Sequence, residues 1–119
     1  MRVYLPRSLG KVRVTTPGTP VQITTNTAVR AAIIRFSVLL DGTGKVYLGG
    51  NWMNSSTGAG VIKEFQPITA TGGIADELIL EAPVVGSHGT FRLSDFFIDA
   101  DVANEGLLVS YFIREPDRL

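Results

Sequence analysis

Acidic and amide side chains gather in one segment toward the C-terminal end, where their spacing suits cation binding. Asp99, Asp101 and Asn104 supply side-chain oxygen atoms at short intervals, and oxygen ligands are those that calcium prefers. The segment does not match an EF-hand loop, which needs a helix on each side and a glutamate at its twelfth position. A polar turn, in which these side chains accept hydrogen bonds from nearby amides, explains the pattern more simply. The sequence therefore predicts no metal site, with calcium at these three residues as the alternative.

Side chains for nucleophilic or acid–base catalysis are scarce. His88 is the sole histidine and the chain has no cysteine, so there is no thiol nucleophile and no set of two or three imidazoles for a metal centre. No Gly-x-Ser-x-Gly elbow presents a serine to His88. Gly42 and Gly44 precede an expected strand instead of the helix that would hold a phosphate. We therefore predict that the protein is not an enzyme and binds no cofactor.

An aromatic residue stands out in the polar loop between residues 49 and 60. Trp52 and Met53 lie there among glycine, asparagine, serine and threonine residues. An exposed tryptophan beside a methionine can anchor another protein, and with Asn51 and Asn54 as polar neighbours it can also stack on a sugar. A loop tryptophan can equally fold back as a lid over one end of a β domain. The sequence does not decide among these three roles of Trp52: a protein anchor, a sugar-stacking surface and a lid.

Glycine and proline punctuate the chain, with 13 and 6 residues respectively. Between them lie short runs rich in valine, isoleucine, threonine and aromatic residues, which is typical of many short strands. Strands are expected at residues 11–15, 21–25, 29–40, 45–48, 61–65, 77–82, 90–98 and 107–114. The turn residues 41–44 predict that residues 29–48 form a hairpin. The pattern predicts an all-β fold, an antiparallel β-sandwich of jelly-roll-like type with about eight strands.

Alternation along two of these strands predicts which side chains face the core. In the strand at 29–40, one face carries Ala32, Ile34, Phe36 and Val38. In the last strand, Leu107, Val109, Tyr111 and Ile113 share one face, whereas Leu108 and Phe112 lie on the other. Apolar residues on both faces predict that this last strand is covered on both sides.

The first ten residues alternate less clearly and contain Pro6 and Gly10. We expect residues 1–10 to form an extended N-terminal arm and residues 11–119 to form a single domain. An extended arm can add to a neighbour's sheet. Tyr4 and Leu5 in the arm, with Trp52 and Met53 in the loop, are the predicted protein-contact residues.

Charge and hydropathy narrow the choice of partners. The 119-residue chain has 11 basic and 11 acidic residues, without the basic excess of a nucleic-acid-binding protein. No apolar stretch approaches the ~20 residues of a membrane-spanning helix. We therefore expect protein partners and neither nucleic acid nor membrane.

Several segments together resemble small structural proteins from the virions of tailed bacteriophages. They are residues 20–24, 29–34, 44–49 and 54–60, then Leu93–Asp101 as the most specific part, and the last strand after Gly106. The resemblance extends from about Pro20 to Phe112. The N-terminal stretch Met1–Leu9 and the aromatic loop Gly50–Met53 depart from that pattern.

The resemblance implies a capsid decoration or cement protein. Such a protein sits on the capsid surface as a dimer or trimer and bridges neighbouring copies of the major capsid protein, after assembly in the cytoplasm of the bacterial host. The alternative is a glycan-binding or tail- or fibre-associated β-sandwich module, with Trp52 as the stacking platform. Binding of sugars separates the two, because a cement protein is expected to bind none.

Overall fold

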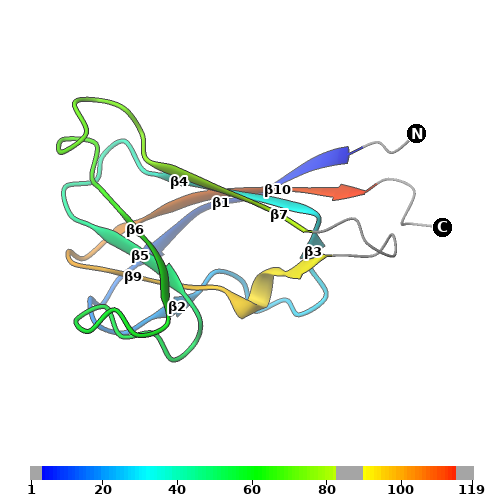
Figure 1. Ribbon diagram of the computed structural model, residues 1–119, viewed down its shortest axis with the longest axis horizontal. Helices are drawn as coiled ribbons and strands as arrows, with labels where there is room; N and C mark the ends of the chain where they lie inside the picture. The colour runs from blue at the N-terminus through cyan, green and yellow to red at the C-terminus, as the bar shows by residue number, and fades with distance from the viewer. Residues whose placement is uncertain (1–3, 83–89, 115–119) are drawn as a thin grey trace.

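The computed structural model describes residues 4–82 and 90–114, with side chains as far as residue 113. The chain forms strands throughout, joined by turns and one short 3-10 turn (Figure 1). No described segment is a helix that is long and apolar enough to cross a bilayer. The elements are β1 (Tyr4–Val14), β2 (Val21–Gln22), β3 (Arg30–Ala31), β4 (Ile33–Val38), β5 (Val46–Gly49), β6 (Val61–Phe65), β7 (Glu77–Glu81), β8 (Phe91–Arg92), the 3-10 turn Leu93–Asp95, β9 (Phe97–Ala100) and β10 (Glu105–Arg114).

Two four-stranded antiparallel sheets pack together as a β-sandwich, which confirms the predicted fold class. Sheet A has the order β1-β10-β4-β7, and sheet B has the order β2-β9-β5-β6. The short strands β3 and β8 form a separate pair. The eight strands of the two main sheets match the expected number.

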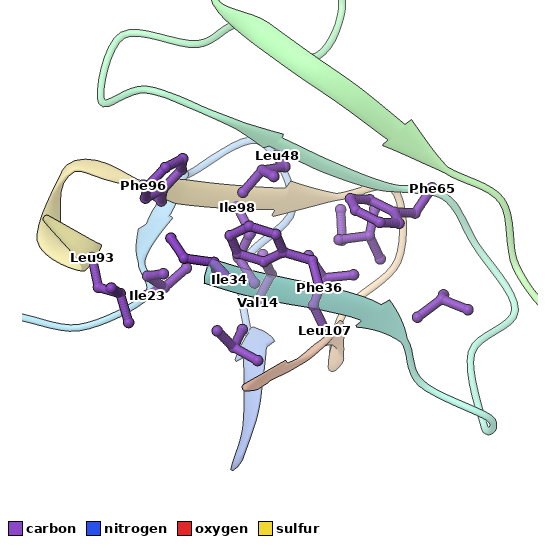
Figure 2. Packing of buried hydrophobic residues seen from close by; sticks show 14 of the residues in the cluster. Val14, Ile23, Ile34, Phe36, Leu48, Phe65, Leu93, Phe96, Ile98 and Leu107 are labelled. Carbon is purple, nitrogen blue, oxygen red and sulfur yellow. The ribbon is translucent and has the colours of Figure 1, made fainter. Parts of the chain in front are cut away.

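The core lies between the two sheets and is built by alternate residues of their strands (Figure 2). Sheet A contributes Phe36 and Leu107, and sheet B contributes Leu48 and Ile98, each completely buried. The Phe36 ring meets Phe96 at a centroid distance of 5.7 Å and an interplanar angle of 54°. This tilted arrangement is among those that aromatic pairs prefer.

The predicted inward face of the strand at 29–40 is confirmed, since Ala32, Ile34, Phe36 and Val38 are all buried. The last strand also buries Leu107 and Val109 on the inner side. Leu108, on its other side, is 42% exposed. At that position the strand is therefore covered on one side and open on the other, contrary to the prediction.

The predicted hairpin of residues 29–48 is wrong. β4 lies in sheet A between β10 and β7, whereas β5 lies in sheet B between β9 and β6. The turn between them carries the chain from one sheet to the other. Its backbone is fixed by Glu105, whose Oε1 accepts hydrogen bonds from the amides of Thr43 (2.7 Å) and Gly44 (3.2 Å). Turn-forming residues predict that a chain bends, but not which sheet it enters next.

Strand boundaries also differ from the prediction. The strand expected at 21–25 is limited to Val21–Gln22, and the one expected at 29–40 is divided into β3 and β4. The first strand begins at Tyr4 instead of Lys11, because β10 offers it a partner along its whole length. The segment at 90–98 is interrupted by the turn Leu93–Asp95, which separates β8 from β9. Leu93 and Ser94 are buried in that turn, so tertiary packing interrupts a run whose composition favours an unbroken strand.

Of the predicted arm at residues 1–10, Tyr4 to Gly10 form the first part of β1. They pair with β10 of the same chain, with a shift in register between Ser8 and Gly10. The paired strands β1 and β10 lie side by side in sheet A (Figure 1).

Candidate functional site

The loop between β5 and β6 separates the two residues that the sequence places together. Trp52 is 76% exposed, whereas Met53 is buried. Backbone bonds hold the loop, because the Met53 amide donates to the Gly50 carbonyl (3.1 Å) and the Asn54 amide donates to the Ala59 carbonyl (2.8 Å). Trp52 is thus presented to solvent from an ordered loop, and Met53 is unavailable as a surface contact.

Two glycines make room for the Trp52 ring. A Cβ atom at Gly60 would lie 3.2 Å from Cδ1 and Nε1 of Trp52, and one at Gly50 would lie 3.6 Å from its Cη2 and Cζ3. Gly60 also has a φ of 73°, which glycine adopts without strain. The indole therefore lies along bare backbone, and this support fixes the ring while most of its surface stays exposed.

A cleft of about 490 Å³ lies beside Trp52. Its walls come from β2, the β2–β3 loop, the β5–β6 loop, β8, the 3-10 turn and β9. The lining residues are Gln22, Thr27, Gly50, Asn51, Trp52, Arg92, Ser94, Asp95 and Phe97. The volume falls in the range of about 300–1,000 Å³ that is typical of small-molecule sites.

The charged side chains of the cleft are Arg92 and Asp95, and both are exposed. Neither forms an ion pair or a side-chain hydrogen bond with any residue in the described part of the chain. Gln22 is held in place, because its Nε2 donates to the Ser94 carbonyl at 2.8 Å. The cleft thus offers one cation, one anion and several neutral polar groups.

The calcium candidates point to separate partners. Asp99 is buried and accepts hydrogen bonds from the amides of Gly18 (2.9 Å) and Ala100 (2.8 Å) and from Ser55 Oγ (3.0 Å). Asp101 accepts a bond of 2.8 Å from the Tyr47 hydroxyl.

Asn104, the third candidate, has a φ of 68° and bonds through its backbone. Its amide donates to the Val14 carbonyl at 2.7 Å, and its carbonyl accepts from Arg13 at 2.7 Å. Within residues 4–82 and 90–113 there is no group of three histidine, cysteine or acidic side chains that could hold a metal ion.

The side chain of Asp99 therefore links β9 to two loops that are remote in sequence, one containing Gly18 and the other containing Ser55. Its side chain lies on the face of sheet B that is turned away from the core, because its neighbours Ile98 and Ala100 face inward. It is nevertheless only 1% exposed, since Gly18 and Ser55 cover it. The predicted polar turn implies bonds to nearby amides, but two of the three partners of Asp99, Gly18 and Ser55, are far away in sequence.

Tyr47 titrates at unusually high pH. Burial, then the hydrogen bond to Asp101 and neighbouring negative charges, raise its pKa from 10.0 to about 12. In the unfolded chain the phenol ionises near pH 10. The contribution of neutral Tyr47 to stability is therefore complete below about pH 10 and is lost as the pH rises toward about 12.

We expect a titration followed by phenolate absorbance to show an ionisation with a pKa of about 12. Tyr47→Phe should remove that step, and Asp101→Asn should lower its pKa, because the phenolate then faces one negative charge fewer. An unchanged titration curve in Tyr47→Phe would contradict this assignment.

The other predicted contact residues lie elsewhere. Tyr4 is 39% exposed and Leu5 is half-buried, both at the start of β1. The start of β1 lies apart from the β5–β6 loop (Figure 1), so the structure does not join these residues to Trp52 in one site. His88 lies outside the described residues.

Sequence reasoning missed the companions of Trp52 in the cleft. Gln22, Arg92 and Asp95 come from distant parts of the chain, and only the tertiary fold brings them beside the loop. The one local signal was the pair of glycines, Gly50 and Gly60, on either side of the tryptophan.

No family model matches the chain, and comparisons with characterised proteins and with solved structures found no significant match.

Proposed function

We propose that this chain is a non-enzymatic structural protein of a tailed-bacteriophage particle. It would decorate the capsid surface as a homo-oligomer and bind the major capsid protein. The observation that carries this proposal is the opposite charge of the two outer strands of sheet A.

The outer strands β1 and β7 each pair on one side only with a described strand. β1 carries Arg7, Lys11 and Arg13 and no acidic residue. β7 carries Glu77 and Glu81 and no basic residue. An unpaired strand edge is a template for a strand of another chain.

Charge decides which edges of two copies would pair. Two β1 strands side by side would oppose like charges, which is unfavourable. Pairing β1 of one copy with β7 of the next brings basic and acidic strands together. Such a head-to-tail contact is heterologous, and it closes into a ring when the rotation between copies permits. This supports a cyclic homo-oligomer such as a trimer.

The outer face of sheet A and the adjoining β4–β5 turn supply apolar surface for the shell. Leu40, Ile79 and Leu108 are 75%, 54% and 42% exposed. Leu40 and Leu108 line a groove of about 390 Å³. Addition through the strand edges would place the outer faces of neighbouring copies side by side. Each copy would then contribute a weak contact to the capsid protein, and the ring would multiply these contacts into avidity.

The test combines light scattering with cosedimentation on shells that lack the protein. The wild-type protein should self-associate and bind shells, and both properties should weaken as salt rises. Lys11→Glu should weaken both, because it places a negative charge at the basic edge. Glu81→Lys should also weaken both, because it leaves the acidic strand β7 with no net charge.

The control is Lys45→Glu, which makes the same change of net charge beside sheet B, and it should leave association unchanged. Failure of the wild-type protein to bind any shell or tail would end the capsid proposal. Equal effects of Lys11→Glu and Lys45→Glu on association would contradict the proposed pairing of β1 with β7.

A further inference from the structure

We infer that the cleft beside Trp52 is a carbohydrate-binding site. This inference is independent of the capsid role, because it concerns sheet B and the β5–β6 loop, and not the edges of sheet A. The ligand class is a neutral saccharide of one or a few rings.

Trp52 provides the stacking surface that a sugar needs. One face of a pyranose ring presents C–H bonds, whose positive ends are attracted to the negative face of an aromatic ring. Trp52 is 76% exposed, yet it lies against the backbone at Gly50 and Gly60. A ring that is already held in place loses little conformational freedom when a ligand stacks on it. The platform is therefore preorganised.

The polar groups of the cleft suit hydroxyl groups. Each sugar hydroxyl both donates and accepts hydrogen bonds. Arg92 offers donors, Asp95 offers acceptors, and the amides of Gln22 and Asn51 offer both. Arg92 and Asp95 do not pair with each other or with any other described residue, so both are available to a ligand.

The balance of charge favours a neutral ligand over an ion. Arg92 and Asp95 contribute one positive and one negative charge to the lining. An anion such as phosphate would meet Asp95, and a cation would meet Arg92, and such like-charge contacts are costly. A neutral hydroxyl-rich ligand bonds to both without this cost.

The size and the rigid walls of the cleft also favour a small ligand. Its volume of about 490 Å³ is that of a small-molecule site. Gln22, Arg92 and Phe97 lie on strands, and sites built on such elements hold their geometry more precisely than sites built on loops alone. Half-buried Phe97 adds an apolar wall among the polar groups.

The experiment uses the single tryptophan of the chain as its reporter. The full chain, without shells, is titrated with cellobiose, maltose, lactose and N,N′-diacetylchitobiose while Trp52 fluorescence is followed. At least one of these sugars should give a saturable change with a Kd of about 1 mM or tighter, and calorimetry should give the same constant.

Variants locate the binding by calorimetry. Trp52→Ala should weaken binding by about thirtyfold or more, as expected for an aromatic anchor. Arg92→Gln and Asp95→Asn should each weaken it by about tenfold, because each loses charge-assisted bonds. The matched control is Ile74→Ala, which removes a side chain that is 74% exposed in the β6–β7 loop, and it should change nothing.

Two results would overturn the inference: none of the four sugars binds, or binding persists unchanged in Trp52→Ala. Since no shell is present, either result leaves the capsid proposal standing. Conversely, a protein that binds sugar but no shell would refute the capsid role alone.

Discussion

Asp99→Ala is expected to lower the free energy of unfolding by about 4 kcal/mol. The carboxylate is 1% exposed and accepts bonds from Gly18, Ala100 and Ser55. Hydrogen bonds to a charged group contribute about 1.5–3 kcal/mol each, and losing the acceptor leaves the buried Ala100 amide unsatisfied. Chemical denaturation with urea measures the change, with an unaltered m-value as evidence that the same cooperative unit unfolds.

Two matched variants separate hydrogen bonding from charge and from general perturbation. Asp99→Asn keeps the oxygen that accepts from Gly18 and Ala100, and its amide can donate to Ser55 Oγ, so we expect a loss of only about 1–2 kcal/mol. Asp101→Ala removes a neighbouring acid from an exposed position with one hydrogen bond, to Tyr47. Its cost should be about 1 kcal/mol. Equal losses of stability in Asp99→Ala and Asp101→Ala would contradict this stabilising role of the Asp99 hydrogen bonds.

Loss of the Asp99 hydrogen bonds should also weaken binding at the proposed sugar site. Ser55 belongs to the loop that carries Trp52, and its bond to Asp99 ties that loop to β9. Without this tie the tryptophan loses part of its preorganisation, and ordering it on binding costs affinity. We therefore expect Asp99→Ala to weaken any sugar binding even at temperatures where the protein remains folded.

Alternation predicted the fold class because burial of one strand face is a local property of the sequence. The inward set from Ala32 to Val38 follows directly from the two-residue period of a strand. Strand partners depend instead on contacts between remote residues. β5 pairs with β9, some fifty positions away, and nothing in residues 45–48 specifies that choice.

The same distinction explains the sites. Trp52 could be found from the sequence, because a lone tryptophan among small polar residues is a local signal. Met53 could not be assigned to the interior, since its burial depends on packing under the loop. The polar part of the cleft could not be predicted for the same reason, because Arg92 and Asp95 lie about forty positions after Trp52 in the sequence. Asp99 was noticed for the right chemistry, oxygen acceptors, but its partners proved to be amides and a hydroxyl.

The second large effect is expected from Gly106→Ala, where β10 pairs with the end of β1. Gly106 pairs with Arg13 of β1. A Cβ atom there would overlap the Val12 carbonyl and lie 2.8 Å from the Arg13 Cα atom. All of these are main-chain atoms, which cannot move aside as a flexible side chain can. Overpacking that displaces backbone costs about 3 kcal/mol or more.

The damage from Gly106→Ala should concentrate in β1, because that strand lies at the edge and can separate from β10 while the rest of the sandwich stays intact. Hydrogen exchange should show faster exchange in β1 than in β4 or β5. Two controls on the same strand pair define the cause. Gly10→Ala meets no atom within 4 Å but has a φ of 76°, so its cost should be about 1 kcal/mol. Ser110→Ala removes one half-buried hydroxyl and should change stability by less than about 1 kcal/mol.

Gly106→Ala also tests the proposed assembly, because it changes the packing of β1 and leaves the charge unaltered. If β1 is the edge that meets β7 of the next copy, a variant that loosens β1 should lose self-association without any change of charge. Gly10→Ala and Ser110→Ala should keep it. Self-association that survives in Gly106→Ala, with β1 shown by exchange to be detached, would place the oligomer contact on another surface.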